Sequence, residues 1–386
     1  MTRAAGDWDR WLDHRLADIR DQGRWRAHRE FDAFGPRGSL VLPGPDGEPA
    51  ERDVVSFASN DYLGLSSHPD VIAAAHAALD RWGTGAGASR LVTGDRPVHE
   101  DLERELAAWK QTERAVLFPT GFAANLGVLA TLGTSEVVIC SDELNHASII
   151  DGTRLARART EVYAHADLEA LDARLAASAS QPVIVVSDTV FSMDGDIASL
   201  EGLARCCRRY DALLVLDEAH AVFGPEPPAG CFEGIEVVRV GTLSKALGSL
   251  GGFAACSQRV ADLLVNAARS AIFTTGSSPA DAAAALAALR IVRGPEGDEL
   301  GARLRRHVDR LRPGHPSPIV PIVLGSETDA VAASGALLDR GLLVPAIRPP
   351  TVPAGTSRLR VTFSSAHTDD DVAVLLEALT QIGALP

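Results

Sequence analysis

Ala212-Leu-Leu-Val-Leu-Asp-Glu-Ala-His220 is an apolar run of strand length that ends in two acidic residues, an alanine and a histidine. Similar short runs recur along the chain, and the stretches between them carry apolar residues at helical spacing, as at Leu102, Leu106 and Trp109. Strands that alternate with helices favour an α/β fold, with a mostly parallel sheet flanked by helices on both faces. The runs that we expect to form this sheet are residues 115–118, 137–140, 183–186, 213–216, 237–240 and 253–256.

The pattern differs at the two ends of the chain. Apolar residues alternate with charged ones from Trp11 to Trp25, which predicts an amphipathic helix in an N-terminal arm. After about Arg293 the order helix, strand (319–324), helix, strand (359–363), helix predicts a smaller α+β domain. The predicted organisation is therefore an arm of residues 1–52, a large α/β domain of residues 53–292 and a C-terminal α+β domain of residues 293–386.

The composition is that of a globular protein with a large core, since 46% of the 386 residues are hydrophobic. A formal net charge of -14 makes attraction to nucleic acid or anionic lipid unfavourable. The sequence shows no export signal and no apolar run of membrane-spanning length, so we expect a cytoplasmic enzyme. The five cysteines form no Cys-x-x-Cys pair, which favours reduced thiols and no metal site.

The chain contains only two lysines, Lys110 and Lys245. Lys245 follows the predicted strand 237–240 on a turn of small residues, where partial desolvation would lower the pKa of its amine and prepare it to attack an aldehyde. Lys110 lies in residues 99–113, whose charged residues have helical spacing, and we expect it to be exposed to solvent. Lys245 is therefore the candidate for imine chemistry.

The ends of other predicted strands supply partners for pyridoxal phosphate (PLP). Asp217 could keep the pyridine nitrogen protonated, which makes the ring an electron sink, and His220 could hydrogen-bond the phenolic oxygen. Phe118-Pro-Thr-Gly-Phe-Ala-Ala-Asn125 joins a strand to a helix start, whose N–H groups could hold the phosphate with help from Thr242. His146 could stack on the ring, and Ser192 places a hydroxyl at a further strand end.

Two motifs suggest other functions but lack their context. Asp217-Glu-Ala-His220 also occurs in helicase-type ATPases, which need a phosphate loop ending in Gly-Lys, and this chain has no Gly-Lys pair. The glycine-rich segment Gly83–Ser89 follows a predicted helix instead of a strand, so it does not fit a dinucleotide-binding turn. We interpret it as a loop that approaches a site.

Taken together, the motifs resemble those of the α-oxoamine synthases, fold-type-I PLP enzymes that condense an amino acid with an acyl thioester and release carbon dioxide. The resemblance runs in order along most of the chain, and its motifs are Ser59-Asn-Asp-Tyr-Leu-Gly-Leu65, Thr120–Asn125, Asn145-His-Ala-Ser148, Val190-Phe-Ser-Met-Asp-Gly-Asp196, Asp217–His220 and Thr242-Leu-Ser-Lys-Ala-Leu-Gly248. Residues 346–360 are similar to the biotin-pathway branch, which uses L-alanine and a pimeloyl thioester of coenzyme A or acyl carrier protein. A glycine-using sister enzyme, such as glycine C-acetyltransferase, shares the cofactor residues and remains an alternative.

The resemblance implies a role for each candidate residue. Lys245 would hold the cofactor as an imine and later remove the substrate's α-proton, with Asp217 on the pyridinium and His146 against the ring. The other implied roles are phenolic-oxygen contacts for Ser192 and His220, phosphate contacts for Gly121, Phe122 and Thr242, a substrate-carboxylate contact for Arg348, a substrate contact for Thr351, and contact with the far end of the acyl group for Arg26 or Arg24.

The resemblance also implies a homodimer with shared active sites, in which residues 83–89 and Thr274-Thr275 would serve the neighbour's cofactor. The chain departs from the family pattern at Ala221–Gly230, which is shortened and rich in proline, and this leaves acyl-chain selectivity open. It departs again at Phe273-Thr-Thr-Gly-Ser277, where one hydroxyl is missing. Some relatives are inactive subunits that lack the lysine, and the presence of Lys245 argues against that alternative.

Overall fold

The computed structural model describes residues 6–43, 48–221, 224 and 226–385, and its large domain is built on a seven-stranded sheet. One strand, β10, is antiparallel to both of its neighbours, so the other six strands run in one direction. All six predicted runs are strands of this sheet, and β6 was not predicted. The spatial order is β4 (Arg114–Phe118), β10 (Gly252–Cys256), β9 (Val237–Thr242), β8 (Leu213–Asp217), β7 (Val183–Asp188), β5 (Val138–Asp142) and β6 (Arg159–Tyr163).

Helices bury both faces of the sheet. Ile184 packs on one face with side chains of α4, α5 and α8, whereas its neighbour Val185 packs on the other face with α6 and α7. This alternation follows from the two-residue repeat of a strand and explains why the central strands are continuous apolar runs. The helices of the large domain are α2 (Pro69–Trp82), α3 (Pro97–Lys110), α4 (Gly121–Leu132), α5 (Ala147–Leu155), α6 (Leu168–Ala177), α7 (Leu200–Tyr210), α8 (Gln258–Ala267), α9 (Arg269–Ile272) and α10 (Pro279–Val292).

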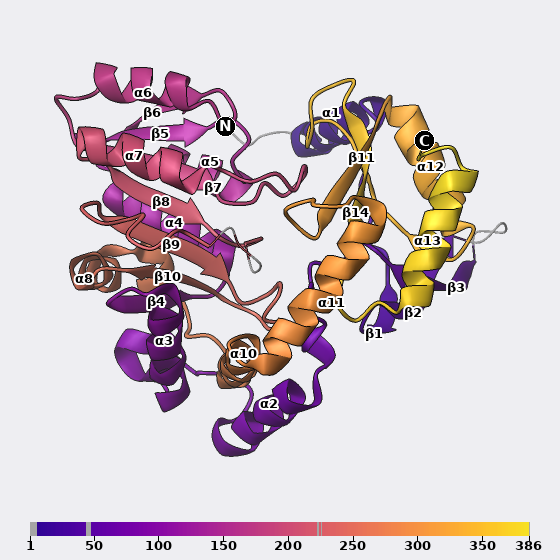
Figure 1. Ribbon diagram of the computed structural model, residues 1–386, viewed down its shortest axis with the longest axis horizontal. Coiled ribbons are helices and arrows are strands. Elements are labelled where there is room, and N and C mark those ends of the chain that lie inside the picture. The colour runs from indigo at the N-terminus through magenta and orange to yellow at the C-terminus, as the bar shows by residue number, and fades with distance from the viewer. Residues whose placement is uncertain (1–5, 44–47, 222–223, 225, 386) are drawn as a thin grey trace.

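The C-terminal part holds a small antiparallel sheet of order β11-β14-β13. Figure 1 shows the arrowheads of β8 and β9 directed toward this sheet, so the carboxyl ends of the large sheet face the C-terminal part of the chain. None of the described helices is long and apolar enough to span a membrane. The elements here are α11 (Pro295–Leu311), β11 (Ile319–Gly325), α12 (Glu327–Leu338), β12 (Leu342–Leu343), β13 (Ala346–Ile347), β14 (Ser357–Thr362) and α13 (Asp369–Gln381).

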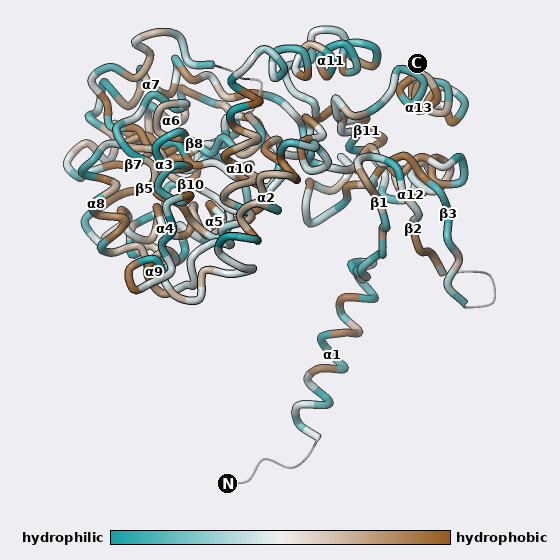
Figure 2. Tube along the Cα trace, turned by 90° about the horizontal axis from the view of Figure 1, so that it is seen from below, coloured by the Kyte–Doolittle hydropathy of each residue, from teal (hydrophilic) through white to brown (hydrophobic). Residues whose placement is uncertain are grey.

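The N-terminal segment contains both a helix and strands. The predicted amphipathic helix is α1 (Asp7–Asp21), which has no buried residue and projects away from the rest of the chain (Figure 2). The following residues form β1 (Phe31–Phe34), β2 (Arg37–Pro43) and β3 (Pro49–Ser56), and β3 pairs in parallel with β12. Much of the predicted arm is therefore sheet that joins the C-terminal part, and the division at residues 52 and 292 stays a proposal.

Lys110 corrects one prediction, because it is buried instead of exposed. Its Nζ lies 2.7 Å from Glu218 Oε2, and Arg239 Nε donates a hydrogen bond to Glu218 Oε1 at 2.5 Å. Burial alone would raise the pKa of Glu218, but the charges of Lys110 and Arg239 outweigh burial and lower it. The helical charge pattern correctly placed Lys110 on a helix. It carried no information about Glu218, which is distant in the sequence but close in the fold.

Replacing Lys110 with methionine leaves the buried Glu218 with a single cationic partner. We expect the free energy of unfolding to fall by about 3 kcal/mol, since removing one member of a buried ion pair leaves a charge poorly compensated. The matched control is Arg104→Met on the same helix, which removes an exposed pair with Asp101 and should cost less than about 1 kcal/mol. Urea denaturation measures both, and equal losses would contradict the structural role of Lys110.

Candidate active site

A cavity of about 230 Å³ lies where β7, β8 and β9 end and where α4 and α5 begin. Ligands of α/β proteins gather at this edge of a sheet because the loops that follow parallel strands converge there. Most of the residues singled out in the sequence line this one cavity, although they are far apart in the chain. They are Gly121, Phe122, His146, Asp217, His220, Thr242 and Lys245.

Lys245 follows β9, and its Nζ lies 2.8 Å from Nε2 of His220. Burial lowers the pKa of the Lys245 amine below its ordinary value, although the carboxylates of Asp217 and Asp188 act in the opposite direction. A lowered pKa increases the fraction of neutral amine, which is the nucleophilic form. The setting predicted for Lys245 is thus the one that the structure shows.

Asp217 is buried at the end of β8 and is held by two hydrogen bonds. Asn125 Nδ2 donates to Oδ2 at 2.6 Å, and the backbone N–H of Ala219 donates to Oδ1 at 2.8 Å. Burial and the negative charge of Asp217 raise the pKa of neighbouring Asp188 well above its ordinary value. The cavity therefore presents a fixed carboxylate at Asp217 and a carboxyl group at Asp188 that resists ionisation.

His146 caps the N-terminus of α5, and its Nδ1 lies 2.7 Å from the hydroxyl oxygen of Ser148. Asn125 Nδ2 also donates to that hydroxyl at 2.8 Å, so one amide joins His146 to Asp217. Partial desolvation of the ring lowers the pKa of His146, which favours the neutral imidazole. A neutral ring held at the edge of the cavity suits stacking against another aromatic ring.

The first turn of α4 forms the anion-binding side of the cavity. Thr120 caps this helix by accepting a hydrogen bond from the N–H of Ala123 at 3.0 Å, and the first N–H groups of a helix have no intrahelical acceptor. A Cβ at position 121 would lie 3.1 Å from Cβ of Thr242, so glycine keeps this turn open. Ser244, which the sequence reading did not single out, adds a hydroxyl 2.7 Å from Thr242 Oγ1. This turn therefore offers free N–H groups and hydroxyls that could donate hydrogen bonds to a phosphate dianion.

Three further residues beside His220 were not predicted. Tyr62 is fully buried, and its hydroxyl oxygen lies 2.6 Å from Nδ1 of His220. The same hydroxyl donates to Asn60 Oδ1 at 3.0 Å, and Arg360 Nη2 donates to that oxygen at 3.2 Å. Residues 59–65 were recognised only as part of a motif, and nothing in their spacing indicated a contact with a residue 158 positions later.

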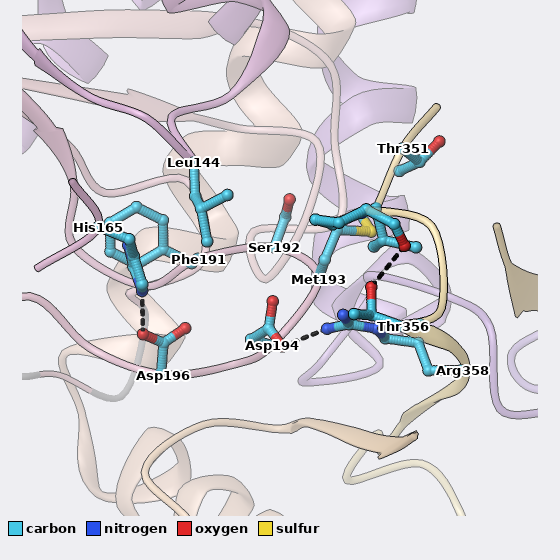
Figure 3. Close-up of a pocket in the computed structure, with 12 residues that line it drawn as sticks. Leu144, His165, Phe191, Ser192, Met193, Asp194, Asp196, Thr351, Thr356 and Arg358 are labelled. Carbon is cyan, nitrogen blue, oxygen red and sulfur yellow. Dashed lines mark hydrogen bonds and ion pairs between the residues drawn. The ribbon is translucent and has the colours of Figure 1, made fainter. Parts of the chain in front are cut away.

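Ser192 and Thr351 line a second cavity, of about 410 Å³, instead of the cavity that contains Lys245 (Figure 3). The contact found for Ser192 is its carbonyl oxygen, which accepts a hydrogen bond from Arg360 Nε at 2.6 Å. The predicted contact of Ser192 with the phenolic oxygen stays a prediction. The second cavity is flanked by the loop after β7 and by the loop that leads into β14.

His165 lies in the wall of this second cavity between two carboxylates. Its Nδ1 is 3.1 Å from Asp142 Oδ1 and its Nε2 is 2.8 Å from Asp196 Oδ2, the latter pair visible in Figure 3. Both contacts need an N–H on the imidazole, which only the doubly protonated ring supplies. Burial alone would lower the pKa of His165, but the two carboxylates outweigh burial and raise it.

The predicted substrate residues Arg26 and Arg348 line a third cavity, of about 210 Å³, together with Arg24 and Thr351. The sequence could not choose between Arg24 and Arg26, and the structure places both there. Three guanidinium groups in one lining would favour the binding of an anion. The altered segment Ala221–Gly230 includes residues 222, 223 and 225, which lie outside the described residues.

The family model for aminotransferases of class I and II matches residues 52–379. An 8-amino-7-oxononanoate synthase of Methylobacterium nodulans is 47% identical over 92% of this chain and 94% of its own. Among solved structures, a serine palmitoyltransferase of S. paucimobilis with a bound PLP–myriocin aldimine has a TM-score of 0.87 at 29% identity and covers 99% of this chain and 100% of its own. An 8-amino-7-oxononanoate synthase of Francisella tularensis has a TM-score of 0.71 at 27% identity and covers 85% and 97%. These matches confirm the predicted fold class.

The charged His165 makes stability depend on pH. A histidine whose pKa is raised by folding contributes stability that is complete below its unfolded value of about 6.5 and is lost as the pH rises through the raised value. We therefore expect the free energy of unfolding to decrease above about pH 6.5, and His165→Gln to remove that part of the decrease. Urea titrations at several pH values measure it, with the exposed His76→Gln as control. A variant slope identical to that of the wild type would contradict the ion pairs.

Proposed function

The chain belongs to the aminotransferase class I and II family, among the 8-amino-7-oxononanoate synthases, and we propose that it joins L-alanine to a pimeloyl thioester. The reaction releases carbon dioxide and the free thiol of coenzyme A or of a carrier protein and yields 8-amino-7-oxononanoate for biotin synthesis. PLP is the cofactor. The observation that carries this proposal is a desolvated lysine amine in one cavity with a fixed carboxylate and an open helix N-terminus.

The residues of this cavity fit PLP, which when bound supplies an aldehyde for an amine and a pyridinium ring that accepts electrons from the substrate's α-carbon. Lys245 would bond to the aldehyde carbon. Asp217 would hold a proton on the ring nitrogen, His146 would lie against the ring, and His220 would hydrogen-bond the phenolic oxygen. The phosphate would be held by Gly121, Phe122, Thr242 and Ser244, where the helix dipole favours an anion.

Lys245 is also our candidate for moving the substrate's proton. With alanine bound, a free amine in this cavity with a lowered pKa would be able to accept the α-proton. The protonated amine would then be stabilised by Asp217, which acts on its pKa in that direction. The same amine would return the proton to carbon after carbon dioxide is lost.

The structure favours Arg360 over the predicted Arg348 for binding the carboxylate of alanine. Arg360 is buried, and its described partners, the Ser192 carbonyl, the Asn60 amide oxygen and the Tyr62 hydroxyl, are uncharged. Within the described residues it forms no ion pair with Asp or Glu, although its charge acts on both Lys245 and His220. A buried guanidinium with no anionic partner is unfavourable unless a ligand supplies the anion. We therefore propose that Arg360 receives the α-carboxylate.

Arg348 fits the acyl thioester better. Its cavity contains Arg24, Arg26 and Thr351, and Thr351 also lines the second cavity, so the two cavities share a wall. Coenzyme A, carrier protein and the pimeloyl carboxylate are all anionic and suit this cluster. A cytoplasmic location and a homodimer, in which residues 83–89 and Thr274-Thr275 reach the neighbour's cofactor, remain part of the proposal.

Product analysis tests the reaction. Holoenzyme with L-alanine and pimeloyl-CoA, or pimeloyl carrier protein, should form 8-amino-7-oxononanoate, identified by mass spectrometry. Turnover of glycine with acetyl-CoA, together with none of alanine, would instead establish the glycine-using sister activity. Borohydride treatment of the holoenzyme followed by peptide mapping should leave the cofactor mass on Lys245 and none on Lys110.

Substitution of Arg360 and of Arg348 should affect the KM of different substrates. Arg360→Gln removes the charge but keeps a hydrogen-bond donor, and we expect KM for L-alanine to rise about 10- to 100-fold, the value of one charged hydrogen bond, with KM for the thioester unchanged. Arg348→Gln should raise KM for the thioester and leave that for alanine near the wild-type value. Steady-state kinetics with each substrate varied in turn measures both. The reverse outcome would restore Arg348 as the carboxylate-binding residue.

A further inference from the structure

Asn125 is a polar residue of α4 in the lining of the cavity that contains Lys245, and only 1% of it is exposed. Asparagine is a weaker helix former than alanine, and a buried amide is unfavourable unless its polar atoms are paired. Its Nδ2 donates to both Asp217 and Ser148, but its Oδ1 has no partner among the described residues. A buried carbonyl oxygen without a partner costs free energy, so the two donors of this amide need an explanation.

The charge of Asp217 fixes which way this amide faces. A carboxylate oxygen can only accept, so the Asn125 atom that lies 2.6 Å from Asp217 Oδ2 must be the nitrogen. The second proton of that nitrogen is donated to the hydroxyl oxygen of Ser148, 2.8 Å away. Turning the amide over would place its oxygen against the negative charge of Asp217. The unpaired Oδ1 is therefore the consequence of serving two acceptors with one amide.

The Ser148 hydroxyl continues this direction to His146. Its oxygen accepts from Asn125, so its single proton can be donated to His146 Nδ1 at 2.7 Å. The backbone N–H of Ser148 also donates to Nδ1, at 3.2 Å, so this ring nitrogen is an acceptor. The lowered pKa of His146 keeps the ring neutral, and its one proton is therefore on Nε2.

We infer that Asn125 is a positioning residue, which uses one amide proton to hold Asp217 and the other to orient the Ser148 hydroxyl toward His146. One side chain then sets both groups that the proposed function assigns to the cofactor's ring, at its nitrogen and against its face. The importance of this arrangement for catalysis rests on the proposed function. The hydrogen bonds themselves can be measured without substrate or cofactor.

The arrangement is compatible with a bound cofactor. Asp217 accepts one hydrogen bond at each carboxylate oxygen, from Asn125 and from the N–H of Ala219, so each oxygen keeps a further lone pair. That lone pair can accept the proton of the pyridine nitrogen while Asn125 stays in place. The hydrogen bond at His146 Nδ1 lies at the edge of the imidazole, so it does not obstruct stacking on its face. Lys245 takes no part in these contacts, so they persist when its amine bonds to the aldehyde.

The first test is NMR of the full-length protein, freed of PLP and labelled with ¹⁵N in its asparagine side chains. The two amide protons of Asn125, identified by the signals missing in Asn125→Leu, should exchange slowly with solvent. Asp217→Ala should shift the resonance of one proton and Ser148→Ala that of the other, because each proton has its own acceptor. Both substitutions acting on the same proton, or neither acting on any, would overturn the inference.

The same protein labelled with ¹⁵N-histidine tests the direction at Ser148. We expect the ring of His146 to be bare at Nδ1 and protonated at Nε2. A wild-type His146 protonated at Nδ1 would contradict the inference with no need for a variant.

The second test measures cofactor affinity, by titration of the PLP-free protein with PLP. Asn125→Leu removes both donors, and we expect Kd for PLP to rise about 10-fold, the value of one hydrogen bond to a charged group. In an Asp217→Ala background the same substitution should change Kd by less than about threefold, because the carboxylate that Asn125 holds is gone. The matched control is Asn266→Leu, which removes an exposed amide donor on α8 and should leave Kd unchanged.

The two backgrounds separate a positioning role from a structural one. An equal rise of Kd in both would mean that Asn125→Leu acts only on the packing of the cavity, and the inference would then be wrong. Asn125→Ala takes the place of the leucine variant in both tests if that variant does not fold. A wild-type protein that took up no PLP would contradict the proposed function, whereas the amide signals would still decide the inference.

Discussion

An amine removed from water sets the requirements of this active site, because a buried ammonium without partners is costly and its pKa falls. Lys245 lies in such a position, and each neighbouring element adjusts how much of that penalty remains. Asp217 compensates the charged form, while Arg360 opposes it. Asp188 itself resists ionisation, because it is buried beside Asp217. Neither protonation state of the amine is therefore strongly favoured. This suits a group that would first attack an aldehyde and later accept a proton.

The two sheets contribute to this balance from opposite sides. The large sheet delivers Asp188, Asp217 and Lys245 at the ends of three adjacent strands. The small sheet delivers Arg358 and Arg360 from β14, where the two-residue repeat of a strand places both on one side while Leu359 and Val361 fill the core. Arg358 pairs with Asp194, and Arg360 donates to the carbonyl of Ser192, so both arginines bind the loop that follows β7. A shift of β14 by one residue would remove both contacts and expose the apolar side chains.

The pattern of consecutive residues was sufficient to predict the buried central strands and the residues at their ends. The central strands, the helix start at Gly121 and the strand-end residues Asp217 and Lys245 were predicted because burial on both faces and turn chemistry are written in consecutive residues. Strand β6 was missed because it lies at the edge of the sheet, with four of its five residues exposed or half-buried, so its sequence lacks a continuous apolar run. The prediction for Lys110 was wrong, and Tyr62 and Arg360 were missed, for another reason. Their partners Glu218, His220 and Ser192 are more than 100 positions away, and helical or strand spacing contains no information about such pairs.

The near absence of lysine becomes understandable from the same chemistry. The proposed reaction needs positive charge in several places, which we assign to Arg360 for the amino-acid carboxylate and to Arg24, Arg26 and Arg348 for an anionic thioester. A lysine at any of these positions would carry an amine able to bond with a reactive aldehyde in competition with Lys245, whereas the guanidinium of arginine stays protonated and is not nucleophilic. Lys110, the other amine in the chain, is buried in an ion pair with Glu218. Positive charge and nucleophilicity are therefore assigned to different residue types, so that binding anions does not create a second site for the cofactor.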